Sequence, residues 1–399
     1  MKKAYVFPGQ GSQRRGMGEN LFDEFPELTK KADRILEYSI KELCLINPDQ
    51  KLNLTQYTQP AMYVVNALSY QKKMKDGEKQ PDFLAGHSLG EYNALHAAGV
   101  ISFEDGLRLV KMRGELMSHA KDGAMAAILD SSEKKVRGIL NEANLTTIDI
   151  ANLNSPSQIV ISGLINDVNK AQPYFEKANT MFIPLNTSGA FHSRYMKKAE
   201  KEYEQFIRKI KFSKPNIEVI ANVTGKPYGL ENISQNLIDQ LSNCVRWSDS
   251  IMYLLSQGVE EFEELGVGDV LTKLLVWIKK GYNPINPGND RTQVTAQDSK
   301  ERRSVPSTDT SNVATPINRE NVRQHDEGGG VRQKEQLDAT ELVEQWNKTY
   351  PVGTQVISEF YDTTLETRTQ AMILFGHRAA VYMNGYNGYF DLREVRPVK

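Results

Sequence analysis

The stretch Pro81-Asp82-Phe83-Leu84-Ala85-Gly86-His87-Ser88-Leu89-Gly90-Glu91-Tyr92 begins as a short apolar strand, passes a serine flanked by glycines, and continues as a helix. Residues 86–90 fit the G-x-S-x-G nucleophile elbow, a turn so sharp that the positions two residues from the serine need almost no side chain. Five residues with two glycines also occur by chance, but a strand before them and an amphipathic helix after them are the context that the motif requires. The pattern therefore predicts Ser88 as a nucleophile.

Composition limits the kinds of protein that this chain can be. Its 399 residues are enough for two or three domains, and a net charge of -1 gives no indication of nucleic acid or an anionic membrane as a partner. The two cysteines, Cys44 and Cys244, lack metal-ligand spacing and are too few for a disulfide framework, so we expect a cytoplasmic protein without a metal site. No apolar run reaches the roughly 18 residues of a membrane span, and the first residues lack a signal-peptide pattern.

Strands and helices alternate over residues 1–280, which predicts an α/β-hydrolase-like core with a parallel sheet. Within it, residues 124–187 are predicted to follow the order β-α-β-β-α-β of a ferredoxin-like subdomain. The α/β core is expected to resume after His192 with a helix and the strand 217–220. We therefore expect one domain over residues 1–280 that contains an inserted subdomain.

The texture of the sequence changes after residue 280. No aromatic residue occurs between Tyr282 and Trp346, and the stretch is rich in polar residues, proline and glycine. Such a segment cannot bury enough apolar surface to offset its chain entropy, so residues 281–338 are predicted to be a flexible linker. Residues 339–399 contain short β-type runs separated by turn signals, which predicts a small all-β, barrel-like domain whose role the sequence does not indicate.

A nucleophilic serine needs a base, and the chain contains six histidines: His87, His96, His119, His192, His325 and His377. His87 adjoins the nucleophile on a turn where neighbouring side chains point apart. His192 lies in a loop that follows a strand and precedes a helix, so it opens at the same end of the sheet as the elbow. We predict that His192 is the base and forms a hydrogen bond with Ser88 Oγ. No acidic residue clearly completes a triad, so we expect a main-chain carbonyl to orient the ring.

Four motifs resemble, in order and spacing, those of malonyl-CoA:acyl carrier protein transacylases: Phe7-Pro8-Gly9-Gln10-Gly11-Ser12-Gln13, Gly86-His87-Ser88-Leu89-Gly90-Glu91, Met112-Arg113-Gly114 and Gly189-Ala190-Phe191-His192-Ser193. The resemblance covers roughly residues 1–280. It is greatest to the discrete, trans-acting acyltransferases that serve polyketide synthases without a built-in acyltransferase, mainly on the stretch 58–70. A malonyl transacylase of fatty-acid synthesis is the close alternative.

The resemblance implies the roles of the residues at the reacting centre. Ser88 matches the nucleophile that carries the malonyl group as an ester, and His192 matches its base. Gln10 matches a glutamine that lines the oxyanion hole, whose other donor is the main-chain amide of Leu89. Gln240 matches the residue whose main-chain carbonyl orients the histidine ring, which would explain the missing acid.

The resemblance also implies how the substrate is selected. Arg113 matches the arginine that pairs with the free malonyl carboxylate, which suits a planar fork of charged donors. On a helix, a surface ion pair is the usual role of an arginine, but the motif around Arg113 favours the substrate role. Gln59 matches a glutamine near the acyl pocket, and Phe191 matches the bulky residue that narrows the pocket against a 2-methyl branch.

These roles together imply ping-pong acyl transfer from malonyl-CoA to the phosphopantetheine thiol of an acyl carrier protein, and polyketide synthase modules are further candidate partners. No metal or redox cofactor is expected. Three alternatives stay open: an acyl hydrolase of the same fold that proofreads carrier proteins, an unrelated serine esterase, and a docking component with a tethered enzyme. Arg113 argues against the hydrolase, since uncharged acyl chains gain nothing from a buried cation.

Overall fold

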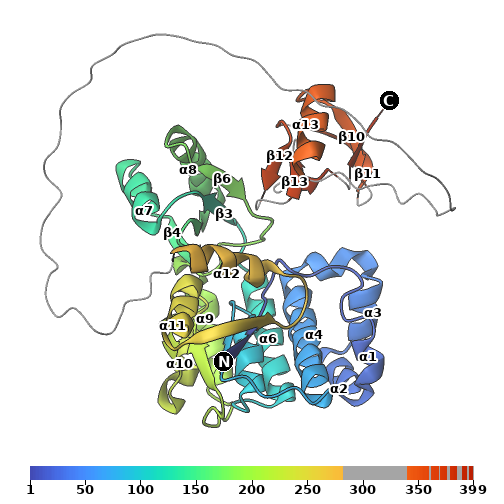
Figure 1. Ribbon diagram of the computed structural model, residues 1–399, viewed down its shortest axis with the longest axis vertical. Helices are drawn as coiled ribbons and strands as arrows, with labels where there is room; N and C mark the ends of the chain where they lie inside the picture. The colour runs from blue at the N-terminus through green and yellow to red at the C-terminus, as the bar shows by residue number, and fades with distance from the viewer. Residues whose placement is uncertain are drawn as a thin grey trace, which may run out of the picture. The chain divides into compact units, whose positions relative to one another are not determined.

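The computed structural model describes residues 1–281 and, beyond them, residues 339–358, 361–367, 369–374, 378–383, 389–392 and 395–398 (Figure 1). The chain divides into two compact units, and the first contains all of residues 1–281. The predicted linker falls outside the described residues from position 282 onward. None of the described helices is long and apolar enough to cross a membrane.

A five-stranded sheet with the order β8-β7-β2-β1-β9 forms the centre of the first unit. Its strands β1 (Lys2–Phe7), β2 (Phe83–Gly86), β7 (Glu218–Ala221) and β9 (Val259–Glu264) run parallel, and the short edge strand β8 (Lys226–Pro227) is antiparallel to β7. Strands of parallel sheets are normally buried under helices on both faces. The structure therefore confirms the predicted α/β class with a parallel sheet.

Helices cover both faces of this sheet (Figure 1). Side chains alternate along β1, so Ala4 and Val6 join a core cluster with residues of α11 and α12. The rings of Tyr5 and Phe7 instead form T-shaped pairs with the ring of Tyr70 in α4. The helices of the first unit are α1 (Leu21–Glu24), α2 (Pro26–Leu36), α3 (Ile40–Leu45), α4 (Thr55–Lys75), α5 (Gly90–Ala97), α6 (Phe103–Ser118), α7 (Glu133–Glu142), α8 (Ile165–Lys177), α9 (Lys197–Ile207), α10 (Ile233–Asp239), α11 (Trp247–Ser256) and α12 (Val270–Gly281).

A second sheet lies between α6 and α9 in the chain. Its strands are β3 (Gly123–Leu129), β4 (Asp149–Ser155), β5 (Gln158–Leu164) and β6 (Met181–Pro184). They pair antiparallel in the order β4-β5-β3-β6. Helices α7 and α8 cover this sheet and contribute Val136, Val168 and Phe175 to its core. The segment thus has its own hydrophobic core.

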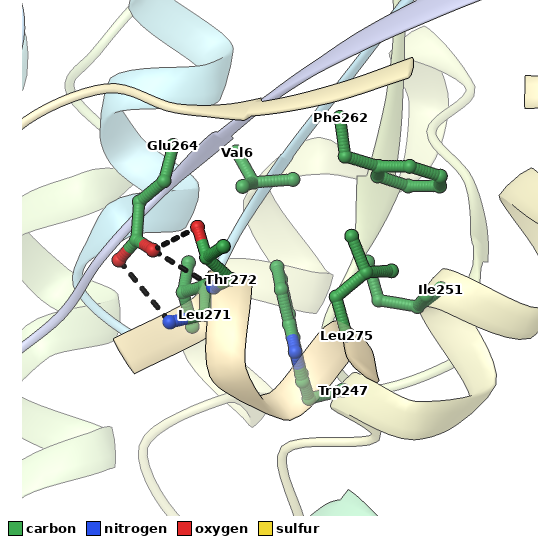
Figure 2. A pocket seen from close by; sticks show the side chains of 8 residues that line it. All are labelled: Val6, Trp247, Ile251, Phe262, Glu264, Leu271, Thr272 and Leu275. Atoms are coloured by element: carbon green, nitrogen blue, oxygen red, sulfur yellow. Dashed lines mark hydrogen bonds between the residues drawn. The ribbon is translucent and has the colours of Figure 1, made fainter. Parts of the chain in front are cut away.

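Glu264, at the end of β9, fixes the start of α12 (Figure 2). Its carboxylate accepts hydrogen bonds from the amides of Leu271 and Thr272 at 3.2 and 2.8 Å and from the Thr272 hydroxyl at 2.8 Å. The first amides of a helix have no intrahelical acceptor, so this side chain supplies one. The small pocket drawn in Figure 2 lies beside this cap, and none of the residues predicted for the active site lines it.

The C-terminal unit corrects the prediction of an all-β domain. Its described part begins with α13 (Ala339–Thr349), where Leu342, Val343 and Trp346 recur at helical spacing and Trp346 is buried. Two three-stranded sheets follow, with the orders β11-β10-β15 and β12-β13-β14. Their strands are β10 (Gln355–Ser358), β11 (Tyr361–Glu366), β12 (Met372–Leu374), β13 (Arg378–Tyr382), β14 (Tyr389–Asp391) and β15 (Val395–Pro397).

Two glycines allow β1, β2 and α5 to approach one another at the turn after β2. A Cβ on Gly86 would lie 1.9 Å from the carbonyl carbon of Gly90, and a Cβ on Gly90 would lie 2.0 Å from the carbonyl oxygen of Phe7. Backbone atoms cannot move away as the end of a flexible side chain can. Any side chain at these positions would therefore push α5 off the sheet.

We expect Gly90→Ala to lower the free energy of unfolding by about 1–3 kcal/mol or to prevent folding, because its methyl group would collide with β1. Gly138→Ala in α7 is the matched control, since no atom lies within 4 Å of a Cβ there. Alanine is the better helix former, so this control should gain up to about 1 kcal/mol. Urea unfolding of both variants measures the difference, and equal losses would contradict the close approach.

Candidate active site

Ser88 lies between the carboxyl end of β2 and the start of α5. Its φ of 52° falls in the left-handed region, where a residue with a side chain is strained. Asn222, which follows β7, supports the turn: its Oδ1 accepts a hydrogen bond from the Ser88 amide at 2.7 Å, and its Nδ2 donates to the Gly86 carbonyl at 2.7 Å. His87 is turned elsewhere, with Nε2 2.9 Å from Asn154 Oδ1. The strained turn is therefore held by a neighbouring strand of the sheet.

His192 reaches Ser88 from the loop between β6 and α9. Its Nε2 lies 2.7 Å from Ser88 Oγ, and its Nδ1 lies 2.7 Å from the main-chain oxygen of Gln240. A carbonyl oxygen can only accept, so Nδ1 carries the hydrogen and Nε2 is free to accept from the serine hydroxyl. Burial, together with the nearby charge of Arg113, lowers the pKa of His192 to about 3. The imidazole is therefore neutral near pH 7 and has the tautomer that a base requires.

Arg113 extends from α6 into the same place and is only 1% exposed. One terminal nitrogen donates to Gln59 Oε1 at 2.8 Å, and the other donates to Ser88 Oγ at 3.0 Å and to Gln240 Oε1 at 2.7 Å. Its Nε has no acceptor among the described residues. Because all these partners are uncharged, the buried cation is suited to an anionic ligand.

The side chain of Gln240 links the members of this group. Its Oε1 accepts from Arg113, while its Nε2 donates to the main-chain oxygen of Ser88 at 2.8 Å and to Glu91 Oε2. Its main-chain oxygen accepts from His192. The residue is fully buried. Gln240 thus forms hydrogen bonds with Ser88, His192 and Arg113.

The two residues predicted for an oxyanion hole lie on adjoining loops. The Leu89 amide, at the start of α5, has no acceptor among the described residues. The loop after β1 packs against it, since a Cβ on Gly9 would lie 2.5 Å from the His87 oxygen and 3.7 Å from the Leu89 nitrogen. The side-chain Nε2 of Gln10 donates a hydrogen bond to Thr55 Oγ1 at 3.2 Å. The structure therefore leaves the Leu89 amide available, whereas the side chain of Gln10 has a partner on α4.

Gln59 and Phe191 are the two remaining residues predicted to line the acyl pocket. Gln59 is 1% exposed, and its Nε2 donates to Met117 Sδ at 3.4 Å while its Oε1 binds Arg113. Phe191 is buried directly before His192, and a Cβ on Gly189 would come within 3.0 Å of its ring. The structure brings Ser88, His192, Arg113, Gln59 and Gln240 into one hydrogen-bonded cluster, which contains neither Gln10 nor Phe191.

Three further residues support the cluster and were not predicted from the sequence: Glu91, Asn222 and Tyr228. Glu91 is fully buried, and its Oε1 accepts hydrogen bonds from the Asn222 amide at 2.7 Å and the Tyr228 hydroxyl at 2.6 Å. Burial raises the pKa of Glu91 to about 7, although these hydrogen bonds act in the opposite direction. Signals in the sequence existed for two of them: Glu91 directly follows the elbow, and Asn222 follows a parallel strand at the carboxyl edge of the sheet. Tyr228 had no such signal.

In the part of the chain that the structure describes, no group of three or more His, Cys, Asp or Glu side chains is placed to hold a metal ion. The chemistry available here is that of a serine, a neutral imidazole, a buried cation and free amides. Such a set can attack a carbonyl carbon, hold the oxyanion that forms, and bind a carboxylate nearby.

Comparison with known proteins agrees with this chemistry. Residues 4–310 match the family model described as "Acyl transferase domain". The polyketide biosynthesis malonyl CoA-acyl carrier protein transacylase PksC of Bacillus subtilis is 58% identical over 278 residues, which are 69% of this chain and 96% of that protein.

Solved structures agree as well. The malonyl CoA-acyl carrier protein transacylase of Burkholderia pseudomallei superimposes with a TM-score of 0.69 and 48% identity, over 71% of this chain and 99% of that one. A malonyl-transacylase solved in complex with the acyl carrier protein of a type II polyketide synthase has a TM-score of 0.67 and 35% identity, over 70% and 94% of the two chains. The chain therefore belongs to the acyl transferase domain family and, within it, to the malonyl-CoA:acyl carrier protein transacylases.

Proposed function

We propose that this protein transfers the malonyl group of malonyl-CoA to the phosphopantetheine thiol of an acyl carrier protein, through an ester on Ser88. The observation that carries the proposal is the position of His192 Nε2, 2.7 Å from the serine hydroxyl and with Nδ1 held by a carbonyl oxygen, beside a buried arginine. A base must be unprotonated to accept the serine proton, and a malonyl group needs a cation for its free carboxylate. The names of the relatives and the solved complex with a carrier protein support the same donor and acceptor.

In the first half-reaction, Ser88 Oγ attacks the thioester carbon while its proton passes to His192 Nε2. The negative charge that forms on the carbonyl oxygen is stabilised by the Leu89 amide and, after a change of partner, by Gln10. When the tetrahedral intermediate collapses, the carbon–sulfur bond breaks and CoA leaves as a thiol with the proton from His192. Ser88 then carries the malonyl ester.

In the second half-reaction, the phosphopantetheine thiol of the carrier protein takes the place of CoA. It gives its proton to His192 and attacks the ester, and collapse returns the proton to Ser88 Oγ. The main-chain oxygen of Gln240 holds Nδ1–H of the imidazole throughout, so no acidic residue is needed to orient it. We expect no metal or redox cofactor in this sequence of steps.

Specificity depends on Arg113. We propose that the malonyl carboxylate replaces Ser88 Oγ as a partner of the guanidinium and also uses the unpartnered Nε, which frees the hydroxyl for attack. Gln59 would keep the opposite edge of the guanidinium in place. Phe191 would narrow the acyl pocket against a 2-methyl branch, although apolar contacts alone discriminate only about 10- to 200-fold.

The pathway and the outer parts of the chain complete the proposal. The name of PksC favours a role in polyketide biosynthesis, and fatty-acid synthesis is the alternative. We further propose that the enzyme is cytoplasmic and supplies a polyketide synthase in trans.

We assign residues 1–280 to the acyltransferase domain. The order β4-β5-β3-β6 supports a ferredoxin-like subdomain near residues 124–187. Residues 281–338 would be a linker to a small β-rich domain at 339–399, with no catalytic part.

Intact-protein mass spectrometry tests the proposed function. Wild-type protein mixed with malonyl-CoA should gain one malonyl group, and Ser88→Ala should gain none because it lacks the hydroxyl. Addition of a carrier protein bearing phosphopantetheine should remove the group from the enzyme and load it on the carrier. Adducts from uncharged acyl-CoAs that are released to water would instead indicate the proofreading hydrolase.

Arg113→Ala should reduce the rate of malonyl loading about 100-fold, which corresponds to about 2.7 kcal/mol, because the carboxylate loses its charged partner. Loading of acetyl-CoA, which has no carboxylate, should fall far less. Arg108→Ala is a matched control on the same helix, since Arg108 is exposed and, among the described residues, forms its ion pair with Asp105. Unchanged malonyl loading in Arg113→Ala would remove this arginine from the proposal.

Removal of all residues after Lys280 should leave loading of a carrier protein within about threefold of the full chain, by kcat/KM in the same assay. The physical reason is that the clustered site residues all lie in the first unit. In addition, 71% of this chain suffices to cover 99% of the Burkholderia pseudomallei structure. A large loss of carrier loading with normal malonyl ester formation would show that the C-terminal part recruits the carrier.

A further inference from the structure

We propose that Glu91 is a positioning residue for the acyl transfer: its buried carboxylate fixes the side-chain amide of Gln240 and, through it, the guanidinium of Arg113 and the imidazole of His192. The inference rests on the proposed function, because its effect is measured on acylation of Ser88. Glu91 itself forms no hydrogen bond with Ser88 Oγ, His192 or Arg113 among the described residues, so it acts through its neighbour.

The partners of Glu91 require an acceptor at every position. Its Oε1 accepts from the Asn222 amide and the Tyr228 hydroxyl, and its Oε2 accepts from Gln240 Nε2. A carboxylate can accept all three hydrogen bonds, whereas a glutamine at this place would turn an NH₂ group toward another donor. Inside a protein, an unmatched donor loses its hydration without compensation.

The orientation of the Gln240 amide is what this carboxylate determines. A glutamine amide has a donor end and an acceptor end, and the two can exchange by a half-turn. With Nε2 held by Glu91 and by the Ser88 carbonyl, Oε1 faces Arg113 at 2.7 Å. The reversed amide would direct N–H groups at the guanidinium, displace it, and shift the main-chain oxygen that orients His192.

Charge supports the same role. Glu91 and Arg113 attract each other, which favours the ionised carboxylate, and the Gln240 amide bridges the two groups. The other titratable groups around Glu91 are tyrosines: Tyr92 on α5, Tyr203 on α9 and Tyr228 after β8. Burial raises the pKa of each, so they stay neutral near pH 7. In its ionised form, Glu91 therefore places a negative charge one amide group away from the guanidinium of Arg113.

Pre-steady-state acylation with malonyl-pantetheine, which lacks the phosphates of CoA, provides the first test. In Glu91→Gln the acylation rate constant should fall about 10- to 100-fold, because the reversed Gln240 amide displaces Arg113 and shifts the oxygen that orients His192. Tyr228→Phe is the comparison: it removes one donor to the same carboxylate but leaves Gln240 its acceptor, so its rate should fall much less. Equal rates in Glu91→Gln and wild type would overturn the inference.

The pH dependence of kcat/KM for acylation provides a second test that uses the native protein. Because the pKa of Glu91 is raised to about 7, the wild-type value should decrease below about pH 7, by up to tenfold per pH unit. Burial and the nearby Arg113 lower the pKa of His192 to about 3, so the imidazole is expected to titrate well below this range. Glu91→Gln should lose the decrease. A decrease that persists unchanged in the variant would overturn the inference.

Stability separates positioning from simple structural support. A carboxyl whose pKa is raised on folding stabilises the fold while it is protonated, and this contribution is lost as pH rises from its unfolded value toward about 7. At about pH 8, Glu91→Gln removes a buried charge but adds an unmatched donor, and these two effects oppose each other. The variant should therefore unfold at a denaturant concentration close to that of wild type. A slower but stable variant supports positioning, whereas parallel losses of rate and stability contradict it. If wild type forms no malonyl ester at all, the proposed function fails instead.

Discussion

The rest of the site depends on the contact between the backbones of Gly90 and Phe7. With no side chain at Gly86 or Gly90, the first turn of α5 lies directly against β1 and β2. The chain can then reverse within the few residues of the elbow, which puts Ser88 in a left-handed conformation at the edge of the sheet. The carboxyl ends of the neighbouring strands open at the same edge, so Asn222 can hold the turn from β7. A tight packing constraint thus exposes the reactive hydroxyl.

The electrostatics of the site agree with this geometry. A buried guanidinium next to an imidazole makes a second positive charge there unfavourable, and burial has the same effect on the ring. The result is a base that stays neutral and a cation that stays available. Arg113 forms its hydrogen bonds with uncharged oxygens, so an entering carboxylate has no competitor of its own charge. Binding of the acyl group and activation of the serine are therefore compatible.

Burial of the polar residues that support Ser88, His192 and Arg113 costs folding free energy. Glu91, Asn222 and Gln240 are all buried, and desolvation of a carboxylate opposes folding. The hydrogen bonds from Asn222, Tyr228 and Gln240 offset part of this cost and leave few alternative arrangements. Functional sites are where proteins commonly accept such local costs. In this family member the cost places the nucleophile, the base and the cation around one glutamine.

Local patterns determined much of this protein: the parallel α/β core, the elbow around Ser88, and a loop that carries His192. They did not determine the helix at 339–349. Few apolar residues recur at helical spacing there, and the β-type runs that follow favoured an all-β interpretation of the whole segment. Only the tertiary structure decided that Glu91 and the side chain of Gln240 support the site. They lie 149 residues apart, and a hydrogen bond between them leaves no periodicity in either segment. Periodicity reports which side chains turn inward, whereas the packing of whole elements selects which of the buried groups meet.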